Sequence, residues 1–382
     1  MGIGSEITLA ELEADPDPIL ARMRATEPVC WVPSMDMWLV TRWNDVAYME
    51  AHPELFSAAT DPSFLARALG PNMLVMDPPA HTRLRDMMLP PFQSSGRSGP
   101  FVSAELAELA DGILDEIEGP TVELMGAYAQ PLTAGALAIV LGLDSHGFDR
   151  MWSWCEGLVT DIANFENDPT ATAIGEAAKA DLGEAIAARI GQAAGGDSAI
   201  DRFVQAGATS AEIVNNVRLM ISGGINEPRD GVGLVAWVLL SRPDLRQAVA
   251  VDGRRLRRLV EEVLRVHSPV GTITRQATRD LELAGAAIAA GDLVSGVLRS
   301  INLDPEHWSN PTEIDLRRRE GPHAAFALGV HRCLGEWLGR QEVRVGVERL
   351  LARFPDMALV ADRPVELQGF EFRGPREVWV TV

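Results

Sequence analysis

The stretch of sequence that decides the fold is Phe326-Ala327-Leu328-Gly329-Val330-His331-Arg332-Cys333-Leu334-Gly335. Its cysteine stands directly before a long amphipathic segment, so the sequence predicts a thiol just ahead of a helix. The unpaired N–H groups and the positive end of the helix dipole favour an anion there. We therefore expect the pKa of Cys333 to be depressed, and the positive charge of Arg332 acts in the same direction.

The residues around Cys333 would suit a flat ligand. Gly329 and Gly335 would let the backbone turn tightly and approach such a ligand closely, and Phe326 could shield the sulfur from water. A thiolate in this setting can hold haem iron, push electron density onto it and favour O–O cleavage. Taken alone, the cysteine could equally be a buried, inert residue.

The loop resembles the cysteine loop of the cytochrome P-450 family, whose pattern is F-x-x-G-x-H-x-C-x-G. The family usually has a second glycine after the phenylalanine, where this chain has Ala327. This departure bears on the backbone near the ring rather than on ligation by Cys333. The resemblance covers nearly the whole chain and implies a bacterial haem-thiolate monooxygenase. The implied fold is mainly α with small β-sheets, and haem b is buried between two long helices.

Composition fits such an enzyme. The 382 residues contain no long linker, so we expect one cytochrome P-450 domain over 1–382, without a fused reductase or ferredoxin domain. Three sparse cysteines argue against a disulfide framework and for the reducing cytoplasm. No apolar signal core starts the chain, and the longest apolar run, 132–143, is too short to span a membrane. We interpret that run as a core helix.

The formal net charge of −20 argues against nucleic acid as a partner, because phosphate binding needs a basic surface. Arginines nevertheless gather in two groups, which are Arg254, Arg255, Arg257 and Arg258, and then Arg332, Arg340 and Arg344. Two interpretations stay open, ordinary solvated helix faces or a docking patch for an acidic redox protein on the cysteine side. A monomer is expected.

Local patterns outline the other elements. Strands are predicted at 29–32 and 37–40, between 273 and 297, and between 365 and 382. Turns are predicted at 284–285 and 290–292. Helices are predicted at 103–117, 211–240 and 245–267.

Glu262 and Arg265 lie three residues apart, which places them on one face of the 245–267 helix. Alone, such a pair is usually a solvated ion pair. The resemblance implies instead that it is locked to a third arginine, and the spacing in Ile314-Asp315-Leu316-Arg317-Arg318 indicates Arg318. The network would then hold the thiolate loop rigid.

Haem propionates need cationic or N–H donors in the protein interior. His81 and Arg85 lie four residues apart and would point the same way from one helix. Arg275 and His331 match the remaining donors of the family. Each of the four could instead be a surface charge or a satisfied core histidine.

The centre of the 211–240 helix is unusual, because it reads Ser222-Gly223-Gly224-Ile225-Asn226-Glu227-Pro228-Arg229-Asp230. Glycines and a proline are costly there, so we expect the helix to open. In the family this opening faces the iron, and an acid followed by a threonine delivers protons. Here Asn226 takes the acid's position and Glu227 the threonine's, so the predicted catalytic residues are Glu227, Asn226 and Gly224.

A carboxyl group at position 227 could act as general acid or base toward hydrogen peroxide, moving a proton between its two oxygens as peroxygenases do. Burial would raise its pKa toward the useful range. The alternative is that Glu227 turns away and pairs with Arg229 or another basic group.

The substrate pocket is predicted from positions in the family to involve Leu219, Ser222, Gly223, Val270, Thr272, Ile273 and Pro375. These residues are mostly apolar, as in most ligand pockets, so a small or medium apolar molecule fits, aromatic ones included. Arg67 could bind a carboxylate, although we interpret it as a surface residue.

The sequence thus predicts a monooxygenase that inserts one oxygen atom of O2 by hydroxylation or O-dealkylation. Its electrons would come from a separate ferredoxin and ferredoxin reductase. Two alternatives stay open, a peroxygenase of the same fold that uses hydrogen peroxide and a haem protein that senses or stores a ligand without turnover.

Overall fold

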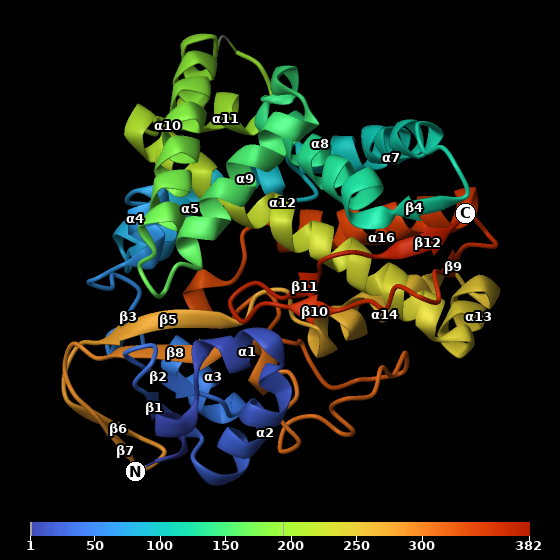
Figure 1. Ribbon diagram of the computed structural model, residues 1–382. Coiled ribbons are helices and arrows are strands. Elements are labelled where there is room, and N and C mark those ends of the chain that lie inside the picture. Colours follow the sequence, from blue (N-terminus) through green and yellow to red (C-terminus); the bar gives the residue numbers. More distant parts are fainter. Residues whose placement is uncertain (1, 194) are drawn as a thin grey trace.

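The structure is a computed structural model that describes residues 2–193 and 195–382, and it consists mainly of helices with small sheets (Figure 1). The predicted fold class is therefore confirmed. The helices are α1 (Leu9–Ala14), α2 (Pro16–Thr26), α3 (Trp43–Ala51), α4 (Phe64–Leu69), α5 (Ala80–Met88), α6 (Ser98–Pro100), α7 (Leu106–Asp115), α8 (Gln130–Leu141), α9 (Phe148–Ile162), α10 (Pro169–Gly191), α11 (Ala199–Gln205), α12 (Ser210–Ser241), α13 (Pro243–Val251), α14 (Arg254–Val266), α15 (Leu298–Ile301) and α16 (Glu336–Arg353). The strands are β1 (Val29–Val32), β2 (Met37–Val40), β3 (Phe56–Ser57), β4 (Thr121–Glu123), β5 (Thr272–Ala277), β6 (Leu281–Leu283), β7 (Ala286–Ile288), β8 (Leu293–Val297), β9 (Ala358–Leu359), β10 (Leu367–Gln368), β11 (Gly374–Pro375) and β12 (Trp379–Thr381).

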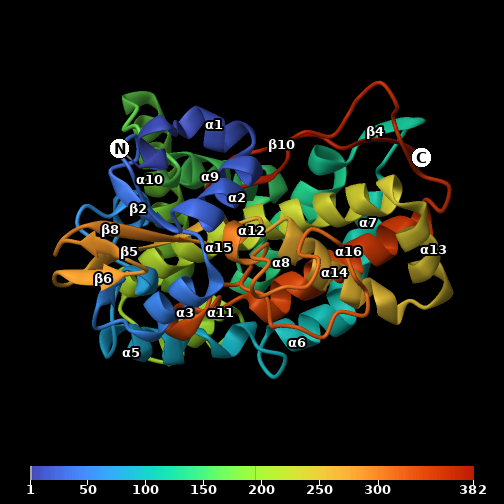
Figure 2. The same cartoon turned by 90° about the horizontal axis from the view of Figure 1, so that it is seen from below.

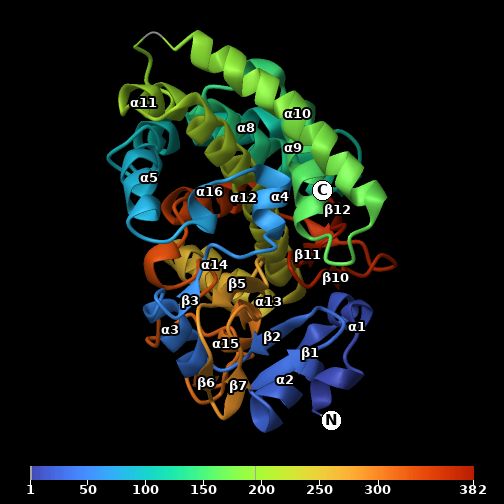
Figure 3. The ribbon, with the colours of Figure 1, turned by 90° about the vertical axis from the view of Figure 1, so that its left-hand side faces the viewer.

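The long helix α12 crosses the middle of the helical part of the molecule (Figures 1 and 3). A capping box fixes its start, because the Thr209 hydroxyl accepts the N–H of Glu212 and the Glu212 carboxylate accepts the N–H of Thr209. The helix packs against α8, α9, α10, α14 and α16. Different faces of α12 therefore meet different partners.

The predicted opening of α12 is not present. The helix runs without interruption through Gly224 and Pro228 from Ser210 to Ser241. A proline removes only one backbone donor, and the buried side chains on both sides of it, such as Ile225 and Val232, are held by the surrounding helices. Tertiary packing outweighs the local cost of these residues.

The largest sheet has the strand order β1-β2-β8-β5-β3 and lies beside α1, α2 and α3 when seen from below (Figure 2). The predicted hairpin is confirmed, with Val29 paired to Val40 and Val32 paired to Met37. The turn between β6 and β7 is also confirmed, and both of its central residues have positive φ, 49° at Ala284 and 85° at Gly285. The sheet positions β5, which carries Thr272 and Arg275.

Two predicted helices have different boundaries. The 245–267 segment forms α13 and α14, because Asp252 is extended and its carboxylate accepts the N–H of Arg254, which starts a new helix. The 103–117 segment begins with a π-helical stretch, Phe101–Glu105, before α7. The apolar run 132–143 forms the buried helix α8, as predicted. No helix within 2–193 and 195–382 is long and apolar enough to cross a membrane.

Glu342 of α16 is a buried acid inside this helical core, with an exposed fraction of 1%. Among the described residues, neither of its carboxyl oxygens has a hydrogen-bond partner. Burial raises the pKa of Glu342 to about 8, because the low-polarity interior penalises the charged form. The side chain is therefore neutral over most of the physiological range.

We predict that Glu342→Gln stabilises the protein increasingly as the pH rises from 4.5 toward about 8. The unfolded carboxyl ionises near its ordinary value while the folded one stays neutral, so the parent loses stability over this interval. Glutamine does not titrate and escapes this loss, which is on the order of 4 kcal/mol at the upper end. Urea unfolding of both proteins near pH 5 and near pH 8 measures the effect, and an equal difference at both pH values would contradict it. Glu184→Gln, on the exposed face of α10, is the control.

Candidate functional site

The cysteine loop is a compact turn ahead of α16. The Cys333 N–H donates to the carbonyl of Phe326 over 2.8 Å. Gly329 has φ 63°, and a Cβ added there would lie 2.5 Å from the carbonyl oxygen of Glu50, so the turn needs glycine. Gly335 has an ordinary φ of −90°, and a Cβ there would meet no protein atom within 4 Å. Gly335 therefore leaves space rather than making a tight turn.

Ala327 takes the left-handed conformation, with φ 58°. The family usually has glycine at this point of the loop, and the structure shows why the difference matters. An L-residue with a Cβ pays roughly 1 kcal/mol or more for this conformation. The alanine therefore stores backbone strain six residues before Cys333.

The Cys333 side chain keeps accessible surface at the start of α16. Burial raises the pKa of the Cys333 thiol to about 11, while the backbone N–H of Gly335 acts to lower it and the Glu227 charge raises it further. The depressed pKa predicted from the helix position is therefore wrong for the polypeptide by itself, because desolvation outweighs the helix end. A metal ion bound to the sulfur would remove the thiol proton.

The predicted propionate donors form one cluster. The rings of His81 and His331 are 4.2 Å apart between centroids, and their four nitrogens are buried without a hydrogen-bond partner among the described residues. Burial lowers the pKa of both histidines, to about 3 for His331, and the charges of Arg85 and Arg275 act in the same direction. Neutral imidazoles beside two guanidinium groups suit a ligand that brings its own anionic oxygens.

Arg275 differs from the other three donors, because it already has a carboxylate partner. Its Nη2 donates to Oε2 of Glu50 over 2.7 Å, and Nη1 donates to the carbonyl of Thr274. Both side chains of this ion pair are buried. Burial raises the pKa of Glu50, which Arg275 opposes. Sequence reasoning missed Glu50, since no motif surrounds it.

Glu262, Arg265 and Arg318 form a buried ion-pair network. The Glu262 carboxylate accepts from Nε and Nη2 of Arg265, over 2.9 and 3.0 Å, and from Nε of Arg318 over 2.8 Å. Their side chains are 7%, 1% and 5% exposed. The surface interpretation of this pair is wrong. Both guanidinium groups also lie against the Trp308 ring.

The same two arginines fix the coil between α15 and the cysteine loop. Arg265 donates to the carbonyls of Asn302, Pro311 and Glu313. Arg318 donates to those of Ser309, Asn310 and Glu313. Backbone carbonyls of an irregular segment need such partners when they are buried.

A second link joins α14 to the cysteine loop, and sequence reasoning missed it. Glu261 bonds Nε2 of His323 over 3.1 Å and accepts from Nε of Arg340 over 2.8 Å. The guanidinium of Arg340 stacks on the Phe326 ring at 4.0 Å. Burial would raise the pKa of Glu261, but His323 and Arg340 lower it to about 2. The carboxylate is therefore ionised and holds the two segments together.

On α12, Glu227 lies on the face that carries Gly223. A Cβ at Gly223 would be 3.7 Å from both carboxyl oxygens of Glu227. Oε2 of Glu227 is buried without a partner among the described residues, and burial raises the pKa of Glu227 well above its ordinary value. The expected alternative of pairing with Arg229 is wrong, because Arg229 donates to Oδ1 of Asp230.

The other two predicted catalytic residues face elsewhere. A Cβ on Gly224 would meet Leu137 of α8 at 3.0 Å, so this glycine serves close helix packing. Asn226 is 7% exposed, and its Nδ2 has no partner among the described residues. It lines a pocket of about 420 Å³ between α9, α12 and the segment from β10 to β11.

The predicted substrate residues come from three regions, which are α12, the chain around β5, and β11. From α12, Leu219 and Gly223 keep accessible surface, and Ser222 is buried. Around β5, Val270 and Ile273 are partly exposed, and Thr272 is buried and donates to Glu371. Pro375 of β11 lines the pocket that Asn226 lines.

Arg67 is not a free surface residue. Its Nε donates to Oδ1 of Asp161 over 3.0 Å, and Nη2 donates to the carbonyls of Asp161 and Asn164. The side chain thereby ties α4 to the C-terminal end of α9 and is not available to a substrate carboxylate.

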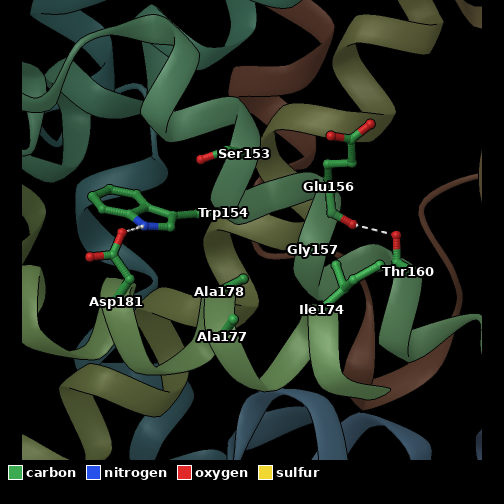
Figure 4. Close-up of a pocket in the computed structure, with 9 residues that line it drawn as sticks. All are labelled: Ser153, Trp154, Glu156, Gly157, Thr160, Ile174, Ala177, Ala178 and Asp181. Carbon is green, nitrogen blue, oxygen red and sulfur yellow. Dashed lines mark hydrogen bonds between the residues drawn. The ribbon is translucent and has the colours of Figure 1, made fainter. Parts of the chain in front are cut away.

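A groove of about 560 Å³ lies between α9 and α10 (Figure 4). Trp154 donates to Asp181 at one end, and the Thr160 hydroxyl donates to the carbonyl of Glu156 at the other. None of the residues predicted to bind haem lines this groove.

Comparisons with known proteins identify the family. The family model described as Cytochrome P-450 matches residues 255–362. The chain is 32% identical to the cytochrome P-450 monooxygenase PikC of Streptomyces venezuelae, over 91% of this chain and 86% of that protein. It is 30% identical to nocardicin C N-oxygenase of Nocardia uniformis subsp. tsuyamanensis, over 96% of each. The ligand-free structure of cytochrome P-450 TbtJ1 has a TM-score of 0.86 at 27% identity and covers 95% of this chain and 96% of its own. The chain belongs to the cytochrome P-450 family.

The relatives are named monooxygenases and hydroxylases, so the protein is an oxidoreductase whose family cofactor is haem b. The residues present fit that cofactor. The Cys333 side chain keeps accessible surface, and the neutral imidazoles of His81 and His331 each have one N–H free to donate to a propionate oxygen, with the charge of Arg85 nearby.

We predict that Glu262→Ala lowers haem incorporation and thermal stability more than it changes any ligand preference. Removing the carboxylate leaves two buried guanidinium groups without their anion, which costs about 3–5 kcal/mol. Thermal unfolding and the haem-to-protein ratio measure the effect, with Glu184→Ala as the exposed control on α10. Normal haem content and an unchanged melting temperature in Glu262→Ala would show that the network is dispensable.

Proposed function

We propose that the protein is a single-domain haem-thiolate monooxygenase of the cytoplasm that oxidises small molecules with O2. The observation that carries the proposal is the proximity of Cys333 and Glu227. The Cys333 side chain keeps accessible surface, Oε2 of Glu227 has no hydrogen-bond partner among the described residues, and the Glu227 charge raises the pKa of the Cys333 thiol. A ligand group and a proton-handling group are thus placed within electrostatic reach of each other.

When bound, haem b supplies oxygen activation, which a thiolate ligand favours by pushing electron density onto the iron. In this proposal Cys333 provides the sulfur. His81, His331 and Arg85 bind the propionates through N–H donors. Phe326, held against Arg340, covers the loop that carries the sulfur.

The buried network has a positioning role in this proposal. Glu262, Arg265 and Arg318 fix the coil that enters the cysteine loop, and Glu261 ties the loop to α14. Because the loop also contains the strained Ala327, these external bonds hold it in one conformation. The sulfur therefore keeps one position relative to the propionate donors.

Peroxygenase activity is a second candidate, and the free carboxyl of Glu227 favours it. The neutral carboxyl of Glu227 can donate its proton to one oxygen of hydrogen peroxide while its other oxygen accepts the proton of the second peroxide oxygen. Arg229 is paired with Asp230, and within 2–193 and 195–382 no arginine forms an ion pair with Glu227. The expected threonine could only donate or accept a hydrogen bond.

Electrons for the O2 reaction would come from a ferredoxin and its reductase. Arg255, Arg257 and Arg258 on α14 are exposed, one to two turns from Glu261, which contacts the cysteine-loop side. The other predicted arginines are neutralised, by ion pairs of Arg332 with Glu336, Arg340 with Glu261 and Glu336, and Arg344 with Glu348. The α14 group is therefore the better docking patch for an acidic protein. The names of the relatives favour turnover over the sensor alternative.

For haem ligation, we predict the red-shifted Soret band of a thiolate-ligated ferrous carbonyl complex in the purified protein. Cys333→His should lose this band, because an imidazole does not donate the thiolate's electron density. Cys155→Ala, at the buried cysteine of α9, should keep it. Retention of the band in Cys333→His would exclude Cys333 as the ligand and would sink the proposed function.

For oxygen chemistry, we predict that product formation driven by hydrogen peroxide depends on Glu227. Glu227→Gln keeps the size and removes the proton transfer, and Glu227→Thr restores the family's usual residue. Both should lose activity, within the range of about 10²–10⁴-fold that general acid–base catalysis contributes. Rates are compared at equal haem content, with Glu184→Gln as control. Equal rates in parent and variants would mean that another group moves the proton.

A further inference from the structure

Glu50 is an acid beside the part of the candidate site that gathers positive charge. It lies in the last turn of α3 and is 5% exposed. Its Oε2 accepts from Nη2 of Arg275 over 2.7 Å, and 225 residues of sequence separate the two partners. The proposed function gives this carboxylate no role.

The backbone of Glu50 lies against the cysteine loop. A Cβ added to Gly329 would be 2.5 Å from the carbonyl oxygen of Glu50 and 3.2 Å from its Cβ. The short turn that begins at Gly329 ends at His331, one of the predicted propionate donors. Glu50 therefore contacts both the turn that carries His331 and the side chain of Arg275.

Arg275 lies within electrostatic reach of the histidine pair. Burial lowers the pKa of His81 and His331, and the charge of Arg275 lowers it further. A guanidinium has five N–H donors, and among the described residues those of Arg275 bond the Glu50 carboxylate and the Thr274 carbonyl. Further N–H donors remain, so Arg275 has capacity for a second anionic partner in addition to Glu50.

The charge of Glu50 changes the electrostatic balance at this edge of the site. A short bond between a carboxylate and a guanidinium favours the ionised form of both, and the two side chains are 9% and 2% exposed, so water screens them weakly. The propionates of a bound haem would bring further negative charge to the same guanidinium. Glu50 thus withdraws part of the positive charge that Arg275 offers to the cofactor.

We propose that Glu50 is a positioning residue that holds Arg275 at the propionate edge and lowers the reduction potential of the haem by its negative charge. Conversion of ferric to ferrous haem adds one electron from the donor protein, and a nearby carboxylate opposes the added negative charge. Buried groups and hydrogen bonds around a haem are among the means by which proteins set its potential. This inference rests on the proposed function, because it concerns the haem that this function requires.

Glu50→Gln separates the charge of the side chain from its shape. Glutamine has the size of glutamate, and its amide oxygen can still accept from Nη2 of Arg275. Oε1 of Glu50 is buried without a hydrogen-bond partner among the described residues, so an amide nitrogen in that place breaks no other bond. The variant therefore removes one negative charge and keeps the contact with Arg275.

The test is a spectroscopic redox titration of the haem-loaded protein at neutral pH. In Glu50→Gln the equilibrium should shift about tenfold toward ferrous haem, as expected for one unit charge inside a protein, which is a rise of about 59 mV for a one-electron couple. Glu50→Asp keeps the charge and should shift the equilibrium by less than about twofold. Glu54→Gln removes an exposed charge just after α3, and because solvent screens that charge the potential should stay near that of the parent.

An unchanged or lower potential in Glu50→Gln would overturn the inference, and so would an equal rise in Glu54→Gln. A Glu50→Gln protein that takes up no haem would overturn it too, because the amide is expected to keep Arg275 in place. Glu50→Asp tests the inference independently, since a rise as large as that expected for Glu50→Gln would show that shape rather than charge sets the potential. The carbonyl spectrum of each sample reports haem ligation separately. A normal thiolate band with an unchanged potential rejects this inference alone, whereas a missing thiolate band in the parent rejects the proposed function.

Discussion

The structure depends on one buried carboxylate, Glu262, and the two guanidinium groups that share it. The coil that runs from α15 to the cysteine loop has almost no regular structure of its own, so its carbonyls cannot be satisfied by a helix or a sheet. Arg265 and Arg318 satisfy them, and Glu262 neutralises both arginines. Without this centre the coil would lack partners for its backbone, and the position of Cys333 would not be fixed relative to α14.

Positive and acidic groups are gathered in two different parts of the candidate site. Around His81 and His331 the structure gathers donors and positive charge, which suits the anionic edge of a cofactor. Around Glu227 and Glu371 it gathers carboxyl groups without cations. Both sets are costly to bury in the polypeptide alone, and in our proposal the cofactor stabilises the donor set. Sites of function commonly store such costs.

Local sequence patterns were sufficient to predict the elements whose conformation depends on a few neighbouring residues. The hairpin around Pro33-Ser34, the turn at Ala284-Gly285 and the buried helix α8 formed as predicted, because turn chemistry and apolar content act over a few residues. Prediction from local patterns failed where tertiary packing opposed the conformational preference of the local sequence. Pro228 did not interrupt α12, and Asp252 split a segment whose apolar period looked continuous. Arg67 looked like a surface charge because its acidic partner Asp161 lies 94 residues away in the sequence.

The sequence by itself determined the family, the helical class and the residues of the thiolate loop, because a cysteine between glycines ahead of a helix is a local signal. Only the tertiary structure decided how these groups behave. Desolvation, which depends on the whole surrounding fold, raises the pKa of Cys333 and outweighs the lowering expected from the helix N-terminus. The fold also brought Glu371 to Thr272 across 99 residues. A hydrogen bond between distant segments has no local pattern, since its partners are selected by the path of the backbone.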